Sequence, residues 1–219
     1  MQKILFLLCL CCSLTACKNQ SFNEMLKDVA EQQVDTTGYQ RRVVYTPDFT
    51  SVAVNCFSDI TYHQISPESS PYVVLRAPAQ VLEHMECVVV NNECLRLELI
   101  PPYRQPESVA FVIDIYAPII DKFTLNGGKC LRLGEIVRDI PLQVELNGSG
   151  AISCQRLVAP DVIAVLNGAG HIDLKQIQVN SVTAEINGVG NIEVSGKAHK
   201  TSLHVNGEGY IDTNSLTKI

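Results

Sequence analysis

Three carboxylates recur at a nearly fixed interval and are candidate ligands for a calcium ion. Asp173, Glu193 and Asp212 are separated by 20 and 19 residues. If this interval is one turn of a stacked β-structure, the three side chains lie about 4.8 Å apart in one column. Ca²⁺ prefers hard oxygen ligands such as these. The alternative, which we favour, is a solvated acidic edge that discourages pairing between sheets.

The other residues with catalytic potential form no convincing motif. His171 precedes Asp173 by two positions and is expected on the same outward side. The sequence reveals no third residue that would complete a catalytic group with these two. Ser149 lies between two glycines, as a catalytic nucleophile can. The other copies of the motif in this chain have chemically different residues at the same position, namely Gly128, Ala169, Val189 and Glu208. No Gly-x-Ser-x-Gly elbow of a hydrolase is present. The remaining histidines are scattered: His63, His84, His199 and His204.

The strongest signal is a repeat, Asn-Gly-x-Gly-x-Ile. Its asparagines are Asn147, Asn167, Asn187 and Asn206, and a degenerate copy begins at Asn126, so the intervals are 21, 20, 20 and 19 residues. Apolar residues stand one and three positions before each Asn, and five and seven positions after nearly all of them. Each repeat therefore predicts two short strands with period-2 alternation around a turn.

A 20-residue repeat of this kind predicts one coil of a parallel β-helix. We expect the asparagines to form a ladder of side-chain hydrogen bonds between coils. The glycines are expected at corners with positive φ, where no Cβ is tolerated. These glycines are Gly148, Gly150, Gly168, Gly170, Gly188, Gly190, Gly207 and Gly209. We interpret the motif as structural, with a direct binding role as the alternative.

The region before the repeats is also predicted to be β-structure, but irregular. Short strand-like runs from residue 41 to 125 are interrupted by prolines, and "PAQVLEHM" predicts one or two helical turns. Cys87 and Cys94 flank a turn, so a disulfide between them is one hypothesis, whereas Cys154 is expected as a small buried apolar residue. The pairing among these and Cys56 and Cys130 stays open.

The N-terminus predicts export and lipid anchoring. Residues 1–16 combine Lys3 with an apolar run too short to cross a bilayer, which is typical of a signal peptide. The ending Leu-Thr-Ala-Cys resembles a bacterial lipobox, and this resemblance implies that Cys17 is acylated and anchors the mature protein to a membrane. Residues 17–40 are polar and are predicted to be a tether.

Composition restricts the partners of the mature chain. Without residues 1–16 it has 16 basic and 23 acidic residues, a net charge of −7, and no basic cluster. This charge argues against nucleic acid or anionic lipid as a ligand. The 46% hydrophobic content is enough for one core, so we expect a single domain over residues 41–219. No cofactor is indicated.

From residue 43 to 217 the chain resembles the auto-transporter adhesin head GIN domain family of bacterial envelope proteins. The resemblance lies in "FTSVAVNCFSDITYHQ", "LRLEL", "VAFVIDIYAPIIDKFTLNG" and the serial Gly-x-Gly coils. It implies a right-handed β-helix like that of pectate lyases. Family coils commonly begin with Ser-Gly-x-Gly where this chain has Asn.

Three functional hypotheses follow. The first is a noncatalytic envelope lipoprotein, in the outer membrane, that binds a glycan or protein ligand through exposed faces and loops. The second is a polysaccharide-active enzyme, because β-helices also host such enzymes. The third is a structural scaffold that forms homo-oligomers through its terminal coil, because the chain ends without a polar capping helix.

Overall fold

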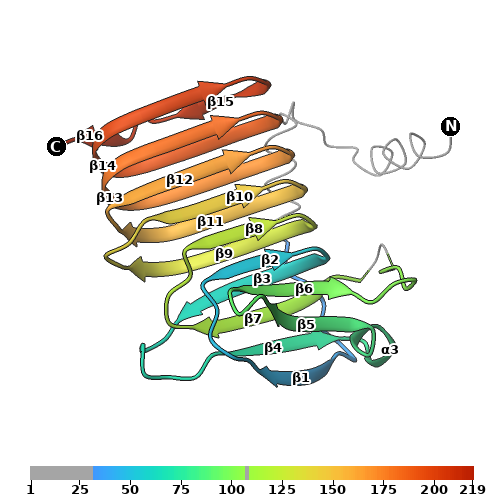
Figure 1. The fold of residues 1–219 in the computed structure, drawn as a ribbon. Coiled ribbons are helices and arrows are strands. Elements are labelled where there is room, and N and C mark those ends of the chain that lie inside the picture. The colour runs from blue at the N-terminus through green and yellow to red at the C-terminus, as the bar shows by residue number, and fades with distance from the viewer. Residues whose placement is uncertain (1–31, 107–108) are drawn as a thin grey trace, which may run out of the picture.

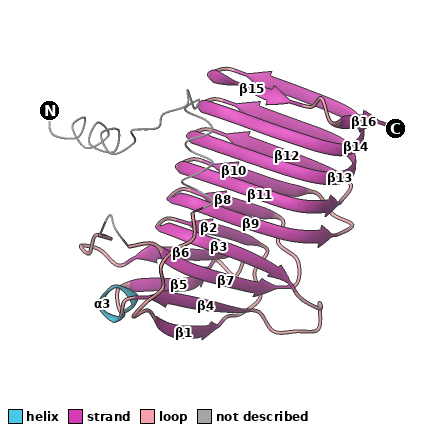
Figure 2. Ribbon diagram, turned by 180° about the vertical axis from the view of Figure 1, so that it is seen from behind, coloured by secondary structure: helices cyan, strands magenta, loops and turns pink. Residues whose placement is uncertain are grey.

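The chain folds as a β-solenoid of about five turns with coils about 20 residues apart (Figure 1). The computed structural model describes residues 32–106 and 109–219. Nearly all regular structure in these ranges is β, and the coils stack in one continuous column (Figure 2). The predicted all-β solenoid is therefore confirmed.

The strands follow one another with one short helix, α3, between β4 and β5. They are β1 (Gln40–Tyr45), β2 (Ser51–Val54), β3 (Phe57–Gln64), β4 (Tyr72–Ala77), α3 (Ala79–Leu82), β5 (Met85–Val90), β6 (Cys94–Leu99), β7 (Phe111–Ala117), β8 (Lys122–Leu125), β9 (Gly128–Val137), β10 (Leu142–Leu146), β11 (Ser149–Val158), β12 (Asp161–Leu166), β13 (Ala169–Ile186), β14 (Val189–Val205), β15 (Glu208–Asp212) and β16 (Leu216–Lys218).

Each coil contributes one strand segment to each of two parallel stacks, which we call sheet 1 and sheet 2. Sheet 1 runs from β6 through β2, β8, β10 and β12 to residues 181–186 of β13 and 200–205 of β14. Sheet 2 runs from β7 through β3, β9 and β11 to residues 169–174 of β13, 189–194 of β14, and β15. Long strands such as β13 pass from sheet 2 into sheet 1 through a corner.

The core lies between the two sheets and consists of stacked apolar columns. Because side chains alternate along each strand, the residue before every Asn points inward, as do the residues five positions after it. Ile152, Ile172 and Ile192 are fully buried in sheet 2, and Leu166 and Ile186 are fully buried in sheet 1. The predicted inward columns thus form one continuous core.

Antiparallel strands close the N-terminal end of the solenoid. β1 pairs with β4 and β4 with β7, while β5 pairs with β6. The β5–β6 turn uses Asn91 and Asn92, both at φ 56°. In this hairpin Cys87 lies opposite Leu97 and Cys94 opposite Val90, so the two thiols are too far apart in register to pair. The hypothesis of a Cys87–Cys94 disulfide is therefore wrong, and both cysteines are free.

The C-terminal end is less covered than the rest. Residues 200–205 pair with residues 181–186 on one side, and no strand in the described part of the chain pairs with their other edge. Leu203 and Val205 continue the inward columns of Ala184 and Ile186, yet they are 40% and 45% exposed. The last coil therefore presents apolar side chains to solvent.

Candidate functional site

The first glycine of each repeat allows the backbones of two coils to approach closely. A Cβ built on Gly168 would lie 1.9 Å from the Gly148 carbonyl oxygen, and one on Gly188 would lie 1.9 Å from the Gly168 carbonyl oxygen. Gly148 and Gly207 are equally restricted. None of these four glycines has a positive φ, so the predicted positive-φ corner is wrong at this position. The requirement for glycine comes from the stacking distance between coils.

The second glycine combines close approach with unusual backbone geometry. Gly150 and Gly190 have φ values of 155° and 146°, as predicted, whereas Gly170 and Gly209 are required because a Cβ would collide with the preceding coil. In the degenerate first copy this position is taken by Lys129, which adopts φ 79°.

The asparagine column forms a hydrogen-bonded ladder along the outside of the corner. In each step the side-chain Nδ2 donates to the Oδ1 of the preceding coil, at distances of 2.7 to 3.0 Å. The rungs are Asn55, Asn126, Asn147, Asn167, Asn187 and Asn206. Five of them were predicted.

The first rung, Asn55, and its acceptor were not predicted from the sequence. Asn55 Nδ2 donates to Glu98 Oε2 at 2.9 Å, so a carboxylate ends the ladder. The signal was present, because Val54 precedes Asn55 and Ile60 follows it by five positions, which is the column spacing of the repeats. Cys56 in place of the first glycine concealed the match.

Beside the ladder lies the outer side of sheet 1, which we call the open face. Its two central columns contain half-exposed side chains in the earlier coils and exposed ones in the last coil. They comprise Cys94, Ser51, Lys122, Gln143, Ile163, Thr183 and Ser202, and Arg96, Ala53, Thr124, Glu145, Val165, Glu185 and His204. Polar, charged and apolar side chains are thus accessible at regular intervals from one end of the solenoid to the other.

Several charges on the open face are locally paired. Lys122 Nζ lies 2.6 Å from Glu145 Oε2, and Arg96 contacts Glu86 and Glu98. Partial burial acts to raise the pKa of Glu145, but hydrogen bonds from Lys122 and Asn147 outweigh it, so the pKa is lowered overall. The face therefore combines paired charges with the carboxylate of Glu185, which accepts a hydrogen bond from Asn187, and with uncharged polar and small apolar groups.

The outer side of sheet 2 differs, because several of its polar residues are buried. Asp173 is only 6% exposed and His171 only 3%, so the expected solvated acidic edge is wrong for this part of the column. His171, Asp173 and Glu193 bring one potential ligand atom each within 4.8 Å of one another. Asp212 is one coil further on and does not belong to this group. The candidate cluster therefore contains a histidine in place of the third carboxylate.

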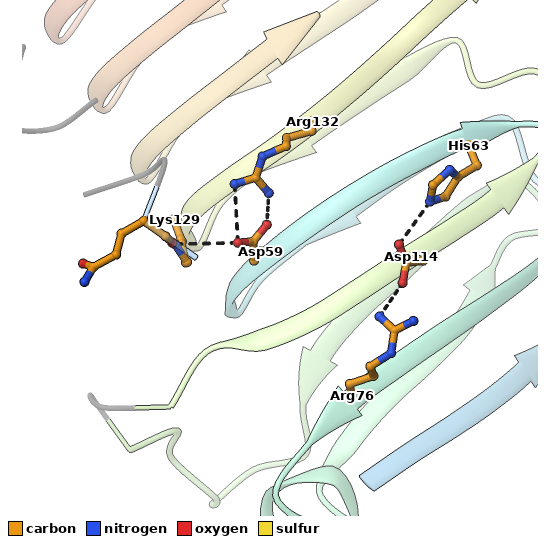
Figure 3. A network of polar contacts seen from close by, with 7 residues as sticks. Asp59, His63, Arg76, Asp114, Lys129 and Arg132 are labelled. Atoms are coloured by element: carbon orange, nitrogen blue, oxygen red, sulfur yellow. Dashed lines mark hydrogen bonds and ion pairs between the residues drawn. The ribbon is translucent and has the colours of Figure 1, made fainter. Parts of the chain in front are cut away.

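Two ion-pair networks connect the N-terminal strands to the solenoid (Figure 3). Asp114 on β7 accepts hydrogen bonds from Arg76 Nη1 at 2.6 Å and His63 Nε2 at 3.0 Å. On the neighbouring strands, Asp59 is paired with Arg132 and lies 3.7 Å from Lys129 Nζ. These networks link β3, β4, β7 and β9 and have a structural role.

Comparison with known proteins agrees with this geometry. The family model "Putative auto-transporter adhesin, head GIN domain" matches residues 48–218. The chain belongs to this family. Among solved structures, a putative lipid binding protein from Parabacteroides distasonis ATCC 8503 superposes with a TM-score of 0.69 at 16% identity, over 82% of this chain and 75% of that one. A putative adhesin from Bacteroides fragilis NCTC 9343 has a TM-score of 0.54 at 20% identity, over 79% and 95%.

These two structures share the fold of this GIN domain, and at such identities they carry no further information about its site. No curated protein matches the chain. The predicted signal peptide (1–16), Cys17 and the first part of the predicted tether (17–40) lie outside the described residues. From residue 32 on, the segment contacts the body, since Lys129 Nζ donates to the Gln32 carbonyl and Tyr39 Oη donates to the Ala110 carbonyl. Within the described ranges, none of the helical structure is long and apolar enough to span a membrane.

Three cysteines of the GIN domain, Cys56, Cys87 and Cys154, carry free thiols of low reactivity. Burial raises the pKa of Cys56 and of Cys154 to about 12, and that of Cys87 to about 11. Because the thiolate is the reactive form, these thiols resist oxidation and alkylation in the folded protein. Cys154 lies in an inward column at 1% exposure, as predicted for a small buried apolar residue.

Proposed function

We propose that this GIN domain is a noncatalytic binding module of the bacterial cell envelope, and that the open face binds an extended glycan or protein ligand. The observation that supports the proposal is the continuity of the open face. Its side chains repeat at the spacing of the coils, about 4.8 Å, over the whole length of sheet 1. A rigid, regularly spaced surface suits a long ligand that contacts several coils at once, because little of it must be ordered on binding.

A charged obstacle on the open face tests this proposal. Thr183→Arg places a long side chain on the face, one coil from its C-terminal end, whereas Gln178→Arg adds the same residue at an exposed position of β13 outside the face. Both variants are expected to fold and to melt like the parent. Against a panel of glycans, matrix proteins and lipid vesicles, a ligand of the parent should bind Thr183→Arg at least tenfold more weakly and Gln178→Arg equally well. Equal loss in both variants would place the ligand elsewhere.

We also propose that acyl chains on Cys17 anchor the protein in the outer membrane, because lipid provides the membrane affinity that a short signal segment cannot. Cys17→Ser is expected to incorporate no radiolabelled palmitate and to leave the membrane fraction. Palmitate that persists in this variant would contradict the anchor. Protease shaving of intact cells then distinguishes a surface protein, which is cleaved, from a periplasmic one, which is protected.

A second role, as a homo-oligomeric envelope scaffold, is favoured by the exposed apolar residues of the last coil. Leu203 and Val205 would be buried if the free edge of residues 200–205 paired with the same edge of another copy. Antiparallel pairing centred on Leu203 keeps both side chains on the core side. Analytical ultracentrifugation should show dimers that Leu203→Glu dissociates, and a monomeric parent would exclude this role.

A further inference from the structure

The buried polar cluster on the outer side of sheet 2 has the chemistry of a transition-metal site. We propose that His171, Asp173 and Glu193 bind a divalent transition-metal ion that joins two successive coils of the solenoid. His171 and Asp173 belong to β13 and Glu193 belongs to β14, in directly paired segments. This site is separate from the open face and does not depend on the binding function proposed for it.

The geometry of the three side chains suits a small ion. Their ligand atoms lie within 4.8 Å of one another. Zn²⁺ bonds to histidine nitrogen and carboxylate oxygen at about 2.0–2.2 Å with tetrahedral angles, so two donors on one ion lie about 3.3–3.6 Å apart. The ligand atoms must therefore approach one another by at most about 1.5 Å, which rotation of the side chains can supply.

The donor set favours a first-row transition metal over calcium. One imidazole and two carboxylates are typical of Zn²⁺ and its neighbours, whereas Ca²⁺ requires six to eight oxygens. An imidazole binds a metal through one ring nitrogen and retains the other for a further contact, so His171 can be a ligand while it keeps another partner. The carboxylate of Asp212, which would have completed a calcium column, is outside the cluster.

A separate observation, at Asn191, also indicates a missing ligand. Asn191 lies beside His171 in the register and is only 3% exposed. Its Nδ2 donates to Glu193 Oε1 at 3.1 Å, but its Oδ1 is buried and accepts no hydrogen bond from the part of the chain that the structure describes. A buried polar atom without a partner is costly, and a metal ion or a metal-bound water would satisfy this oxygen.

The cluster is accessible and is partly neutralised by a cation that can move away. Lys175 Nζ lies 2.8 Å from Asp173 Oδ2, and its side chain is 57% exposed, so it can turn into solvent when an ion enters. Asp173 lines two cavities, one of about 240 Å³ shared with His171 and one of about 220 Å³ shared with Glu193. An ion and its water ligands therefore have a path to the site.

Isothermal titration of the chelator-treated full chain with ZnCl₂ tests the proposal, with CaCl₂ titrated in parallel. We expect one Zn²⁺ per chain and an increase in melting temperature on binding. His171→Gln, Asp173→Asn and Glu193→Gln should each weaken Zn²⁺ binding at least tenfold, while the matched control Asp212→Asn should bind as the parent does. Co²⁺ in place of Zn²⁺ should give visible absorption bands that His171→Gln alters.

Three outcomes would overturn the proposal. The first is the absence of Zn²⁺ binding by the parent chain under conditions in which it is folded. The second is Zn²⁺ binding that survives all three ligand substitutions, which would locate the ion elsewhere. The third is a preference for Ca²⁺ that Asp212→Asn abolishes, which would restore the acidic column as the site.

Discussion

The repeating coils and the N-terminal strands are held together by different interactions. From Asn126 to Asp212, neighbouring coils are linked by close backbone approach at the glycines and by the neutral amide ladder. From Gln40 to Ala117, parallel pairing of β2 with β6 and of β3 with β7 is supplemented by antiparallel pairing of β1, β4 and β5 and by the ion pairs of Asp59 and Asp114. The difference teaches that a repeat can use one uncharged contact at every step, whereas an irregular region needs specific charged partners.

Because neighbouring coils approach so closely, we expect them to tolerate no side chain at the first glycine of the repeat. Gly168→Val would force a Cβ to within 1.9 Å of the Gly148 carbonyl oxygen, so the coils must separate. We expect the free energy of unfolding to fall by at least about 3 kcal/mol. Ala169→Val changes a position that holds Val189 in the next coil and should cost less than about 0.5 kcal/mol. Denaturant unfolding of the two variants measures the difference, and equal stabilities would disprove close stacking at this corner.

In the N-terminal region, loss of the central carboxylate should have an intermediate, salt-dependent effect. Asp114→Ala removes the partner of both Arg76 and His63, and we expect a loss of about 1–2 kcal/mol at low ionic strength. Because Arg76 is partly exposed, salt screens the interaction and the difference from the parent should shrink at 1 M NaCl. A loss that does not change with salt would mean that packing, not charge, is what Asp114 supplies.

A rung of the amide ladder should contribute less, and independently of salt. Asn167→Ala removes two hydrogen bonds of the ladder, to Asn147 and from Asn187, together with a longer one of 3.5 Å to Glu145, and should cost about 1 kcal/mol in thermal or denaturant unfolding. Asn206→Ala removes one such bond and should cost about half as much. If the end rung proves as costly as the middle one, the ladder does not act through these individual bonds.

The smallest effect is expected from pH, at Glu145, a charged residue that contacts the ladder and has a lowered pKa. The pKa of Glu145 is lower in the folded protein than in the unfolded chain, so its ionised form stabilises the fold above the unfolded pKa of about 4.5. This contribution is lost as the pH falls below that value and through the lower folded pKa. Glu145→Gln should therefore lower stability slightly at pH 7 and leave it unchanged in acid, so that the acid limb becomes flatter. An unchanged acid limb would show that Lys122 and Asn147 do not stabilise the ionised form.

The repeating part of the chain was the part that could be predicted from the sequence. The apolar columns, the ladder from Asn126 to Asn206 and the solenoid were predictable because each position is written four or five times. The reason why position 168 must be glycine was not predictable, because the distance between coils is a property of the whole stack and not of one segment.

The polar cluster was only half predictable. Alternation correctly placed His171 and Asp173 on one outer side, but their burial depends on tertiary packing, so the acidic column looked solvated. The Cys87–Cys94 hypothesis failed for a related reason. The two asparagines at positive φ fix the hairpin register, and this register separates the thiols.

The amide ladder has a direction, and this gives the solenoid an electrical polarity along its axis. Glu98 at the first rung can only accept, so Asn55 must turn its amino group toward it, and every later amide follows the same orientation. The amide dipoles therefore add, as peptide dipoles do along a helix, with the positive end neutralised by the Glu98 carboxylate. The negative end is the Asn206 side-chain carbonyl on the last coil. A molecule that docks there with a hydrogen-bond donor or a cation extends the row of aligned dipoles, and its binding is stabilised by all of them.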